Sequence, residues 1–386
     1  MNAGLLGLIP IRGLGSFMYL SLSILLFYVA SKTSFKIKKF CIPFCLAFLW
    51  LLFLFFVKSS GTLNGIYQWF LGGLVVIGFN YLEENDEFVS VFVLLTLILA
   101  LCFSLFEMIS GFHISWSRYS GNNLSSMTPL GLHIPTFYFV NENDFCSALI
   151  LLFFYSRAVY RTRRIVFDIV VLPYVVLCLW VANARLCMIA LTVYYFYMIV
   201  SKFNKKIQLV LYVITATIII LICIEKIIPA LLEAYNYNSK KSTIIRLNLI
   251  LIAIENIFIK KNFFGLGAAS FPDIVGMNPK TAGILDPHNF YIELGVEVGL
   301  LFLVIYLIFI LFYLKTEKNK LFKGLFLVFL ITGLCIGRFS RELWNWFFLA
   351  FFLKRFFYLK RCNKQNRNCD NLNKKISLQM EGDTYE

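Results

Sequence analysis

Long apolar stretches dominate this chain and restrict it to folds that a lipid bilayer can hold. Of its 386 residues, 60% are hydrophobic and only 15% are charged, and the mean hydropathy is +0.77. A soluble core cannot bury that much apolar surface, whereas about 20 consecutive apolar residues are enough to cross a membrane as a helix. The sequence therefore predicts an all-α polytopic membrane protein, with residues 1–386 forming a single integral membrane domain.

The apolar runs predict about eleven transmembrane helices, within a range of about ten to twelve. The N-terminus lacks the basic start and small-residue cleavage site of a secretion signal, so we expect the first span to be retained. Residues 1–13 contain three glycines and a proline, and they could form an interfacial piece or part of a further span. The expected spans are residues 14–30, 41–57, 65–82, 88–107, 135–156, 165–182, 184–200, 207–224, 288–314, 321–337 and 342–358.

Basic residues predict the orientation of these spans. Five segments gather Lys and Arg, and all five fall on one side if the spans alternate. The positive-inside rule identifies that side as the cytoplasm, which accounts for the net charge of +15 without a nucleic-acid partner. We therefore expect a cytoplasmic C-terminus with a basic tail over residues 359–386. The segments are 31–40, 157–164, 201–206 and 315–323, with four, four, three and four basic residues, and Lys354–Lys375 with eight.

The outer side is expected to hold two sizeable loops, residues 108–134 and 225–287. Within the second loop, residues 243–259 are apolar but are interrupted by four polar side chains. A further span there would move the later basic segments to the wrong side, so we interpret this run as a helix lying at or dipping into the outer interface. The interrupting side chains are Arg246, Asn248, Glu255 and Asn256, and the three histidines of the chain, His113, His133 and His288, also fall on the outer face.

The ten cysteines do not form a disulfide framework in this interpretation, because most lie inside apolar runs and none falls in the longest polar loop. The chain has no Cys-x-x-Cys motif, no Asp-x-Asp motif on the outer face and no cluster of His and carboxylates. We therefore expect neither a metal nor another cofactor. The cysteines are Cys41, Cys45, Cys102, Cys146, Cys178, Cys187, Cys223, Cys335, Cys362 and Cys369.

Residues 285–301 gather the most polar chemistry at the head of one long apolar run. His288 and Asn289 precede the run, and Glu293 and Glu297 lie one and two turns inside it. Intramembrane carboxylates are costly and usually face protein or a water-filled cavity, and an i, i+4 pair shares one helix face. His288 could cap the helix, or it could transfer a proton to or from a sugar hydroxyl.

Two arginines on the outer side are candidates for binding an anion. Arg185 lies in a tight turn between two spans, and Arg246 lies on the expected interfacial helix. Each could be a lipid-headgroup contact, or each could hold phosphate oxygens, because a guanidinium matches them in a bidentate geometry. Arg338 and Arg341, at the outer turn between the last two spans, are further candidates for the same anionic pocket.

Two other motifs allow both a structural and a binding interpretation. Asn141, Asn143 and Asp144 start the fifth span, where such residues cap helices, but they could also bind sugar hydroxyls. Gly265 and Gly267 follow two lysines in a hinged turn, which is either a flexible connection or a weak phosphate-binding signal.

Together these motifs resemble the O-antigen polymerase and O-antigen ligase superfamily of bacterial envelope glycosyltransferases. The resemblance covers roughly residues 135–315, and the N-terminal helices share only its hydropathy. Asn262 stands where the family often has proline. The motifs that carry the resemblance are Asn183–Arg185, Arg246 followed by Lys261–Gly267, His288–Asn289 with Glu293, Glu297 and Gly299–Leu300, and Asn141–Asp144.

The resemblance implies a metal-independent glycosyltransferase with a GT-C-like fold in the bacterial cytoplasmic (inner) membrane, its active site facing the periplasm. Its donor would be an undecaprenyl-pyrophosphate-linked oligosaccharide. Arg185 and Arg246 would hold the pyrophosphate, and His288 would activate the acceptor hydroxyl. The other motif residues would bind substrate. Partner proteins would include a chain-length regulator and a flippase, besides the membrane lipids.

Three functions remain open on the sequence. A polymerase would join repeat units on the carrier lipid, and the Gly265–Gly267 and Asn143–Asp144 elements favour it. A ligase would move the finished glycan to lipid A-core. A polysaccharide or lipid transporter predicts polar residues at the membrane midplane and a repeat between halves, whereas the polar residues here gather at the outer face. A scaffold protein would leave the outer Arg and His motifs unexplained.

Overall fold

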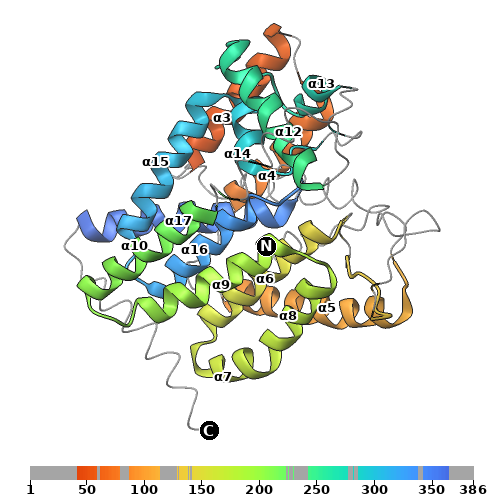
Figure 1. The fold of residues 1–386 in the computed structure, drawn as a ribbon. Coiled ribbons are helices and arrows are strands. Elements are labelled where there is room, and N and C mark those ends of the chain that lie inside the picture. Colours follow the sequence, from red (N-terminus) through yellow and green to blue (C-terminus); the bar gives the residue numbers. More distant parts are fainter. Residues whose placement is uncertain are drawn as a thin grey trace.

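A computed structural model of the chain shows how these segments fold (Figure 1). All statements below concern the residues that the structure describes. These are residues 41–58, 61–78, 87–113, 141–222, 242–276, 286–337 and 342–364, with 128, 130–137, 139, 225, 229 and 281 between them.

Every element over these residues is helical, which confirms the all-α prediction for the described part of the chain. The helices are α3 (Ile42–Lys58), α4 (Leu63–Gly78), α5 (Glu87–Ser110), α6 (Glu142–Val159), η2 (Arg161–Arg163), α7 (Arg164–Val166), η3 (Phe167–Val171), α8 (Leu172–Val181), α9 (Arg185–Val200), α10 (Lys205–Ile222), α12 (Ser242–Ile254), η5 (Glu255–Ile259), α13 (Phe271–Val275), α14 (Phe290–Glu293), η7 (Leu294–Val298), α15 (Leu300–Thr316), α16 (Lys320–Thr332) and α17 (Leu343–Lys364).

Two of the described helices are long and apolar enough to cross a membrane, Val89–Ser110 and Arg164–Val181. Shorter apolar helices cover Ile42–Val57, Leu63–Gly78, Arg185–Val200 and Leu300–Thr316. The total of about eleven spans, the GT-C-like fold and the division into domain and loops stay predictions, and the expected first span and residues 1–13 lie outside the described residues.

Two expected helix boundaries are wrong. The run at 288–314 is not one helix, because it breaks at Gly299, whose φ of 114° is open to glycine but not to an ordinary helical residue. Before the break, η7 is a π-helix, a form often found at functional sites. The fifth span starts at Glu142 rather than at residue 135, because Asn141 caps the helix there.

The helices pack into one large apolar core and one small one. In Figure 1, α12 and α13 lie at the top of the view, and α5, α6 and α8 lie in its lower half. Helix α16 packs against α9 and α6, and α17 packs against α4 and α15. The small core joins α12 and α13 to η7 through Ile245, Leu249, Phe271 and Val296. The helix expected at 243–259 therefore exists as α12 and η5, and its place at the membrane interface stays a prediction.

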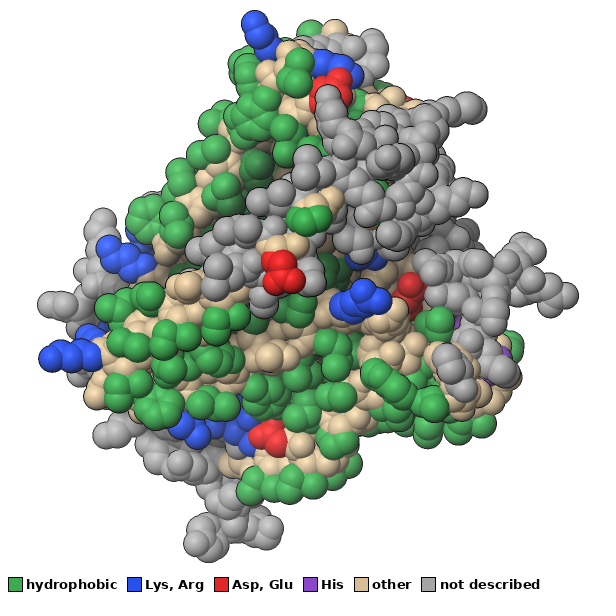
Figure 2. Space-filling view, in the orientation of Figure 1, with side chains coloured by type: hydrophobic (Ala, Val, Ile, Leu, Met, Phe, Trp, Pro, Cys, Tyr) green, Lys and Arg blue, Asp and Glu red, His purple; other side chains and the backbone are tan. Residues whose placement is uncertain are grey.

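Large apolar side chains cover much of the outside of the molecule. On α15 Leu311 is 70% exposed, and Ile169 and Leu209 on other helices are about equally exposed, at 68% and 65%. Figure 2 shows this face as broad hydrophobic areas with few charged side chains between them. Exposed apolar surface on this scale indicates contact with lipid, as in a membrane protein.

Helix α4 makes a close contact through two adjacent glycines. A Cβ atom at Gly72 would lie 2.3 Å from Cε2 of Trp346, and one at Gly73 would lie 2.3 Å from Cε1 of Phe44. The two rings also touch each other edge to face, with centroids 5.4 Å apart. The helix backbone itself therefore forms one wall of an aromatic cluster between α3, α4 and α17.

We predict that Gly72→Ala destabilises the protein, because the added methyl group overpacks the Trp346 ring, at a cost of about 1–3 kcal/mol. The measurement is the apparent midpoint of thermal unfolding in detergent. Gly295→Ala is the matched control, since its Cβ would meet only side-chain ends of Ile257 and Leu303, both at 3.3 Å. Equal midpoints for the two variants would contradict the prediction.

Candidate active site

The turn at residues 333–337, after α16, contacts two of the predicted motifs, those of His288 and Asn141–Asp144. The amide of Phe290 donates to the carbonyl of Gly333 at 2.8 Å, and the amide of His288 donates to that of Gly337 at 3.1 Å. The Gly337 amide in turn donates to Oδ1 of Asp144 at 2.8 Å. One glycine thus joins the start of α6 to the His288 motif.

His288 and Asn289 form the entry to α14. His288 has a φ of 49°, which is uncommon for a residue with a side chain, and it is half-buried. Asn289 caps the helix, because its Oδ1 accepts from the amides of Tyr291 at 2.9 Å and Ile292 at 3.3 Å. The structure thus gives Asn289 a capping role, and its contact with substrate stays a prediction.

The Asn141 motif is likewise a helix cap. Oδ1 of Asn141 accepts from the amides of Asn143 and Asp144, both at 3.0 Å, and its Nδ2 donates to Asp144 at 2.7 Å. Asp144 is buried and Asn143 is half-buried. The cap fixes the Asp144 carboxylate so that it can also hold Gly337.

Arg185 starts α9, and this helix is tied to the same turn. The Arg185 side chain is exposed, and its Nε donates to Oδ1 of Asn183 at 3.2 Å. Two residues further, Sγ of Cys187 lies 3.9 Å from Sγ of Cys335, inside the turn. Oγ of Ser147 on α6 lies 3.6 Å and 3.4 Å from these two sulfur atoms.

Arg246 lies on α12, and its side chain is half-buried. Residue Ile245 beside it is buried in the small core, which fixes the helix. His288 bonds to the 333–337 turn through its amide, and Arg185 starts the helix whose Cys187 meets Cys335 in that turn. The approach of Arg246 to the same turn stays a prediction. Two guanidinium groups and an imidazole in such segments can bind an anion and transfer a proton.

The Gly265–Gly267 loop docks on the π-helix η7. The amides of Leu266 and Gly267 donate to the carbonyls of Val296 and Glu297, both at 2.9 Å. The Glu297 carboxylate accepts from the Ala269 amide at 2.9 Å. These contacts give Gly267 and Glu297 a structural role, and the substrate-binding role of Gly265, Gly267 and Glu297 stays a prediction.

The roles of three other predicted residues stay predictions. Glu293 is 1% exposed and lies in the last turn of α14. Arg338 and Arg341 lie outside the described residues. Within the described part of the chain, no three His, Cys, Asp or Glu side chains are grouped so as to hold a metal ion.

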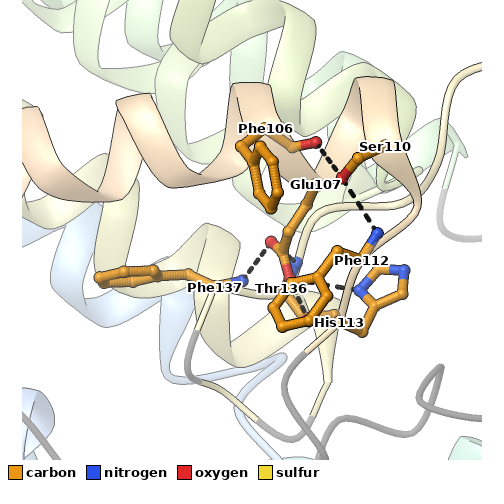
Figure 3. A network of polar contacts seen from close by, with 7 residues as sticks. All are labelled: Phe106, Glu107, Ser110, Phe112, His113, Thr136 and Phe137. Atoms are coloured by element: carbon orange, nitrogen blue, oxygen red, sulfur yellow. Dashed lines mark hydrogen bonds and ion pairs between the residues drawn. The ribbon is translucent and has the colours of Figure 1, made fainter.

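Sequence reasoning missed the buried carboxylate of Glu107 near the end of α5 (Figure 3). Its oxygens accept from the amides of Thr136 at 2.9 Å and Phe137 at 2.6 Å, and from the Thr136 hydroxyl at 3.2 Å. Nδ1 of His113 lies 3.2 Å from the same carboxylate. The sequence does contain a signal for this residue, because Glu107, like Glu293, is a glutamate inside an apolar run.

The seven described cysteines that are free include Cys187 and Cys335, as expected for apolar buried thiols.

The 333–337 turn itself carried no motif that sequence analysis could use. Its contacts are made by the backbone groups of Gly333 and Gly337, and every residue has a backbone carbonyl, so the residue types do not reveal them.

A scan of protein families supplies independent evidence on the same segments. Residues 169–307 match the family described as O-antigen ligase. The chain carries a domain of the O-antigen ligase and polymerase superfamily. Members of this family are glycosyltransferase-like enzymes, and the family implies lipid-linked oligosaccharide substrates in the membrane. A search of curated proteins found no match.

The matched segment contains Arg185, Arg246 and His288. Asp144 and Gly337, which connect the His288 motif to α6, lie on either side of it. The candidate site therefore combines the family segment with two flanking helices.

We predict that Asp144→Ala loosens the 333–337 turn, because the buried Gly337 amide loses its acceptor at a cost of about 1–3 kcal/mol. Hydrogen exchange at residues 333–337 should increase. Asp144→Asn retains an oxygen acceptor and should show a smaller change, and Asn143→Ala is the neighbouring control. Unchanged exchange in Asp144→Ala would contradict this role.

We predict that Glu107→Ala frees the segment 134–137, because two backbone amides and the Thr136 hydroxyl lose their shared acceptor. Limited proteolysis and hydrogen exchange of this segment provide the measurement. Glu107→Gln keeps an acceptor oxygen of similar size and should retain most of the protection. If both variants behave like the unaltered protein, Glu107 does not anchor the segment.

Proposed function

We propose that this protein is a polysaccharide polymerase of the O-antigen, capsule or exopolysaccharide type. It joins undecaprenyl-pyrophosphate-linked repeat units at the outer leaflet of the bacterial cytoplasmic membrane, with its C-terminus in the cytoplasm. A flippase and a chain-length regulator are its proposed partners. The family match supports a glycosyltransferase acting on lipid-linked oligosaccharides.

One observation carries this proposal: Arg185 and Arg246 have no carboxylate partner among the described residues. Two other arginines of the chain do. Arg157 pairs with Asp168 at 2.6 Å, and Arg355 pairs with Glu317. A guanidinium group without an ion partner is suited to an anionic ligand, and a pyrophosphate supplies one.

In the proposed reaction, a hydroxyl oxygen of the acceptor sugar bonds to the anomeric carbon of the donor. The bond from that carbon to the pyrophosphate oxygen breaks, and the electron pair leaves with the pyrophosphate. His288 takes the proton from the attacking hydroxyl, and Arg185 and Arg246 stabilise the charge on the leaving group. Removing one such cation costs about 2–4 kcal/mol, or about two to three decades of rate.

Transfer of a finished glycan to lipid A-core is the second candidate, because the matching family is described as O-antigen ligase. The polymerase is favoured by the Asn143–Asp144 and Gly265–Gly267 elements of the sequence. The two activities share the donor chemistry and differ only in the acceptor, so they are separated by the products that accumulate.

The test is complementation of a deletion strain of the native host, with its polysaccharide analysed on a gel. Arg185→Ala, Arg246→Ala and His288→Ala are compared with the unaltered chain at matched expression. We expect the deletion to leave core plus a single repeat, the unaltered chain to restore a ladder, and each variant to lose most of it. Arg163→Ala removes one exposed arginine from the expected cytoplasmic segment 157–164 and is the charge-matched control.

Two other outcomes point elsewhere. Bare core together with polymer accumulating on the carrier lipid would identify a ligase. Unchanged polysaccharide in the deletion strain, or full activity of all three variants, would overturn the envelope-glycosyltransferase proposal and would make transport the function to test.

A further inference from the structure

An apolar pocket of about 300 Å³ lies between α3, α4, α15 and α17, at the end of the His288 motif. Its lining is rich in aromatic and branched aliphatic side chains, and among the described residues that line it, Lys360 alone is charged. A sugar or a phosphate would find few hydrogen-bond partners there. The pocket is therefore suited to a hydrocarbon ligand.

One end of this pocket adjoins the candidate active site. Phe290 and Leu294 line it, and the Phe290 amide is the group that bonds to Gly333 in the 333–337 turn. The ring of Phe290 also meets Tyr306 edge to face, with centroids 5.1 Å apart. Because Phe290 is only two residues from His288 in the chain, a ligand whose polar end lay at His288 would have the pocket directly beside it.

The pocket then follows α15 away from the site. Side chains from Phe302 to Phe312 line it, which is about 15 Å of helix at 1.5 Å per residue. Phe309 packs edge to face on Phe356 of α17, with centroids 5.5 Å apart, and Lys360 of α17 also lines the pocket. The lining thus extends from Phe290 and Leu294 beside the candidate site along α15, as a lipid chain leaving that site would require.

The opposite wall is held rigidly. It includes Trp346 and Phe44, the two rings that pack directly on the backbone of Gly72 and Gly73. Trp69 adds a third ring, with its centroid 5.0 Å from that of Trp346. A preformed pocket of this kind binds a chain without first having to rearrange its own side chains.

We infer that this pocket binds the first part of the polyprenyl chain of the lipid-linked donor. An apolar cavity of about 150 Å³ holds benzene, so about 300 Å³ holds roughly twelve carbon atoms, or about two isoprene units. The polar end of the lipid then lies at the 333–337 turn, and the rest of the chain continues into the bilayer. This inference rests on the proposed function, because it takes the donor to be a lipid pyrophosphate.

The pocket thereby positions the pyrophosphate of the donor relative to the candidate site. A lipid anchored by its first two isoprene units holds the pyrophosphate at a set depth, whatever sugar it carries. Because the pocket is apolar, it adds affinity for a lipid-linked pyrophosphate but not for a free one. The site therefore gains selectivity for the carrier lipid.

The test is binding of radiolabelled undecaprenyl pyrophosphate to the purified full chain in phospholipid nanodiscs, with inorganic pyrophosphate as the second probe. Ile305→Trp fills the pocket, and Leu307→Trp is its matched control. The two positions are 43% and 44% exposed, but only Ile305 lines the pocket. Loss of two buried carbons is enough for about a tenfold loss of affinity.

We expect Ile305→Trp to weaken binding of undecaprenyl pyrophosphate about tenfold or more and to leave inorganic pyrophosphate binding unchanged. Leu307→Trp should match the unaltered chain on both probes. Equal affinity of the two variants for undecaprenyl pyrophosphate would overturn the pocket assignment while leaving the proposed function intact. If the unaltered chain binds neither probe, the proposed function itself fails.

Retained binding of inorganic pyrophosphate shows that Ile305→Trp is folded. If that binding is lost, the same comparison is made with Ala47→Leu, which adds a smaller side chain from the opposite wall. Independently, benzoylphenylalanine at Phe309 should crosslink a polyprenyl lipid in native membranes. Crosslinks only to phospholipid, or only to residues 14–30 of the chain itself, would overturn the assignment.

Discussion

The backbone of Gly337 connects two parts of the chain on which the candidate site depends. Its amide is held by the Asp144 carboxylate, and its carbonyl holds the amide of His288. A Cβ atom at this position would meet Asn141 Nδ2 and Asp144 Oδ2, both at 3.3 Å. Asp144 is therefore a positioning residue: it sets the place of His288 through two hydrogen bonds, without needing to touch a substrate.

The other end of α6 is fixed by an ion pair instead. The Asp168 carboxylate accepts hydrogen bonds from both Nε and Nη2 of Arg157, and the Tyr195 hydroxyl donates to the same carboxylate at 2.9 Å. The Arg355–Glu317 pair similarly joins α17 to the segment after α15. Arg157 and Arg355 are thus paired with carboxylates, whereas Arg185 and Arg246, the proposed anion ligands, have no carboxylate partner among the described residues.

Hydropathy placed several helices closely, since α9 was expected at 184–200 and covers Arg185–Val200. It could not place the break at Gly299 or the start of α6, because both are set by backbone angles and a side-chain cap rather than by apolarity. Motif types also identified Arg185, Arg246 and His288 as candidates. The contact of the His288 and Asn141–Asp144 motifs with the 333–337 turn was beyond sequence reasoning, because that turn acts through main-chain groups that no residue pattern distinguishes.

The break at Gly299 links the candidate site to the apolar pocket. A Cβ atom at Gly299 would lie 2.7 Å from the carbonyl carbon of Phe264, and the Leu300 amide donates to the Phe263 carbonyl at 2.8 Å. The loop before Gly265 therefore occupies the break and starts α15 as a separate helix. One apolar run consequently serves two purposes: α14 holds the polar motif against the turn, and α15 lines a hydrocarbon pocket. An unbroken helix would have to give both segments the same direction, whereas here each keeps its own.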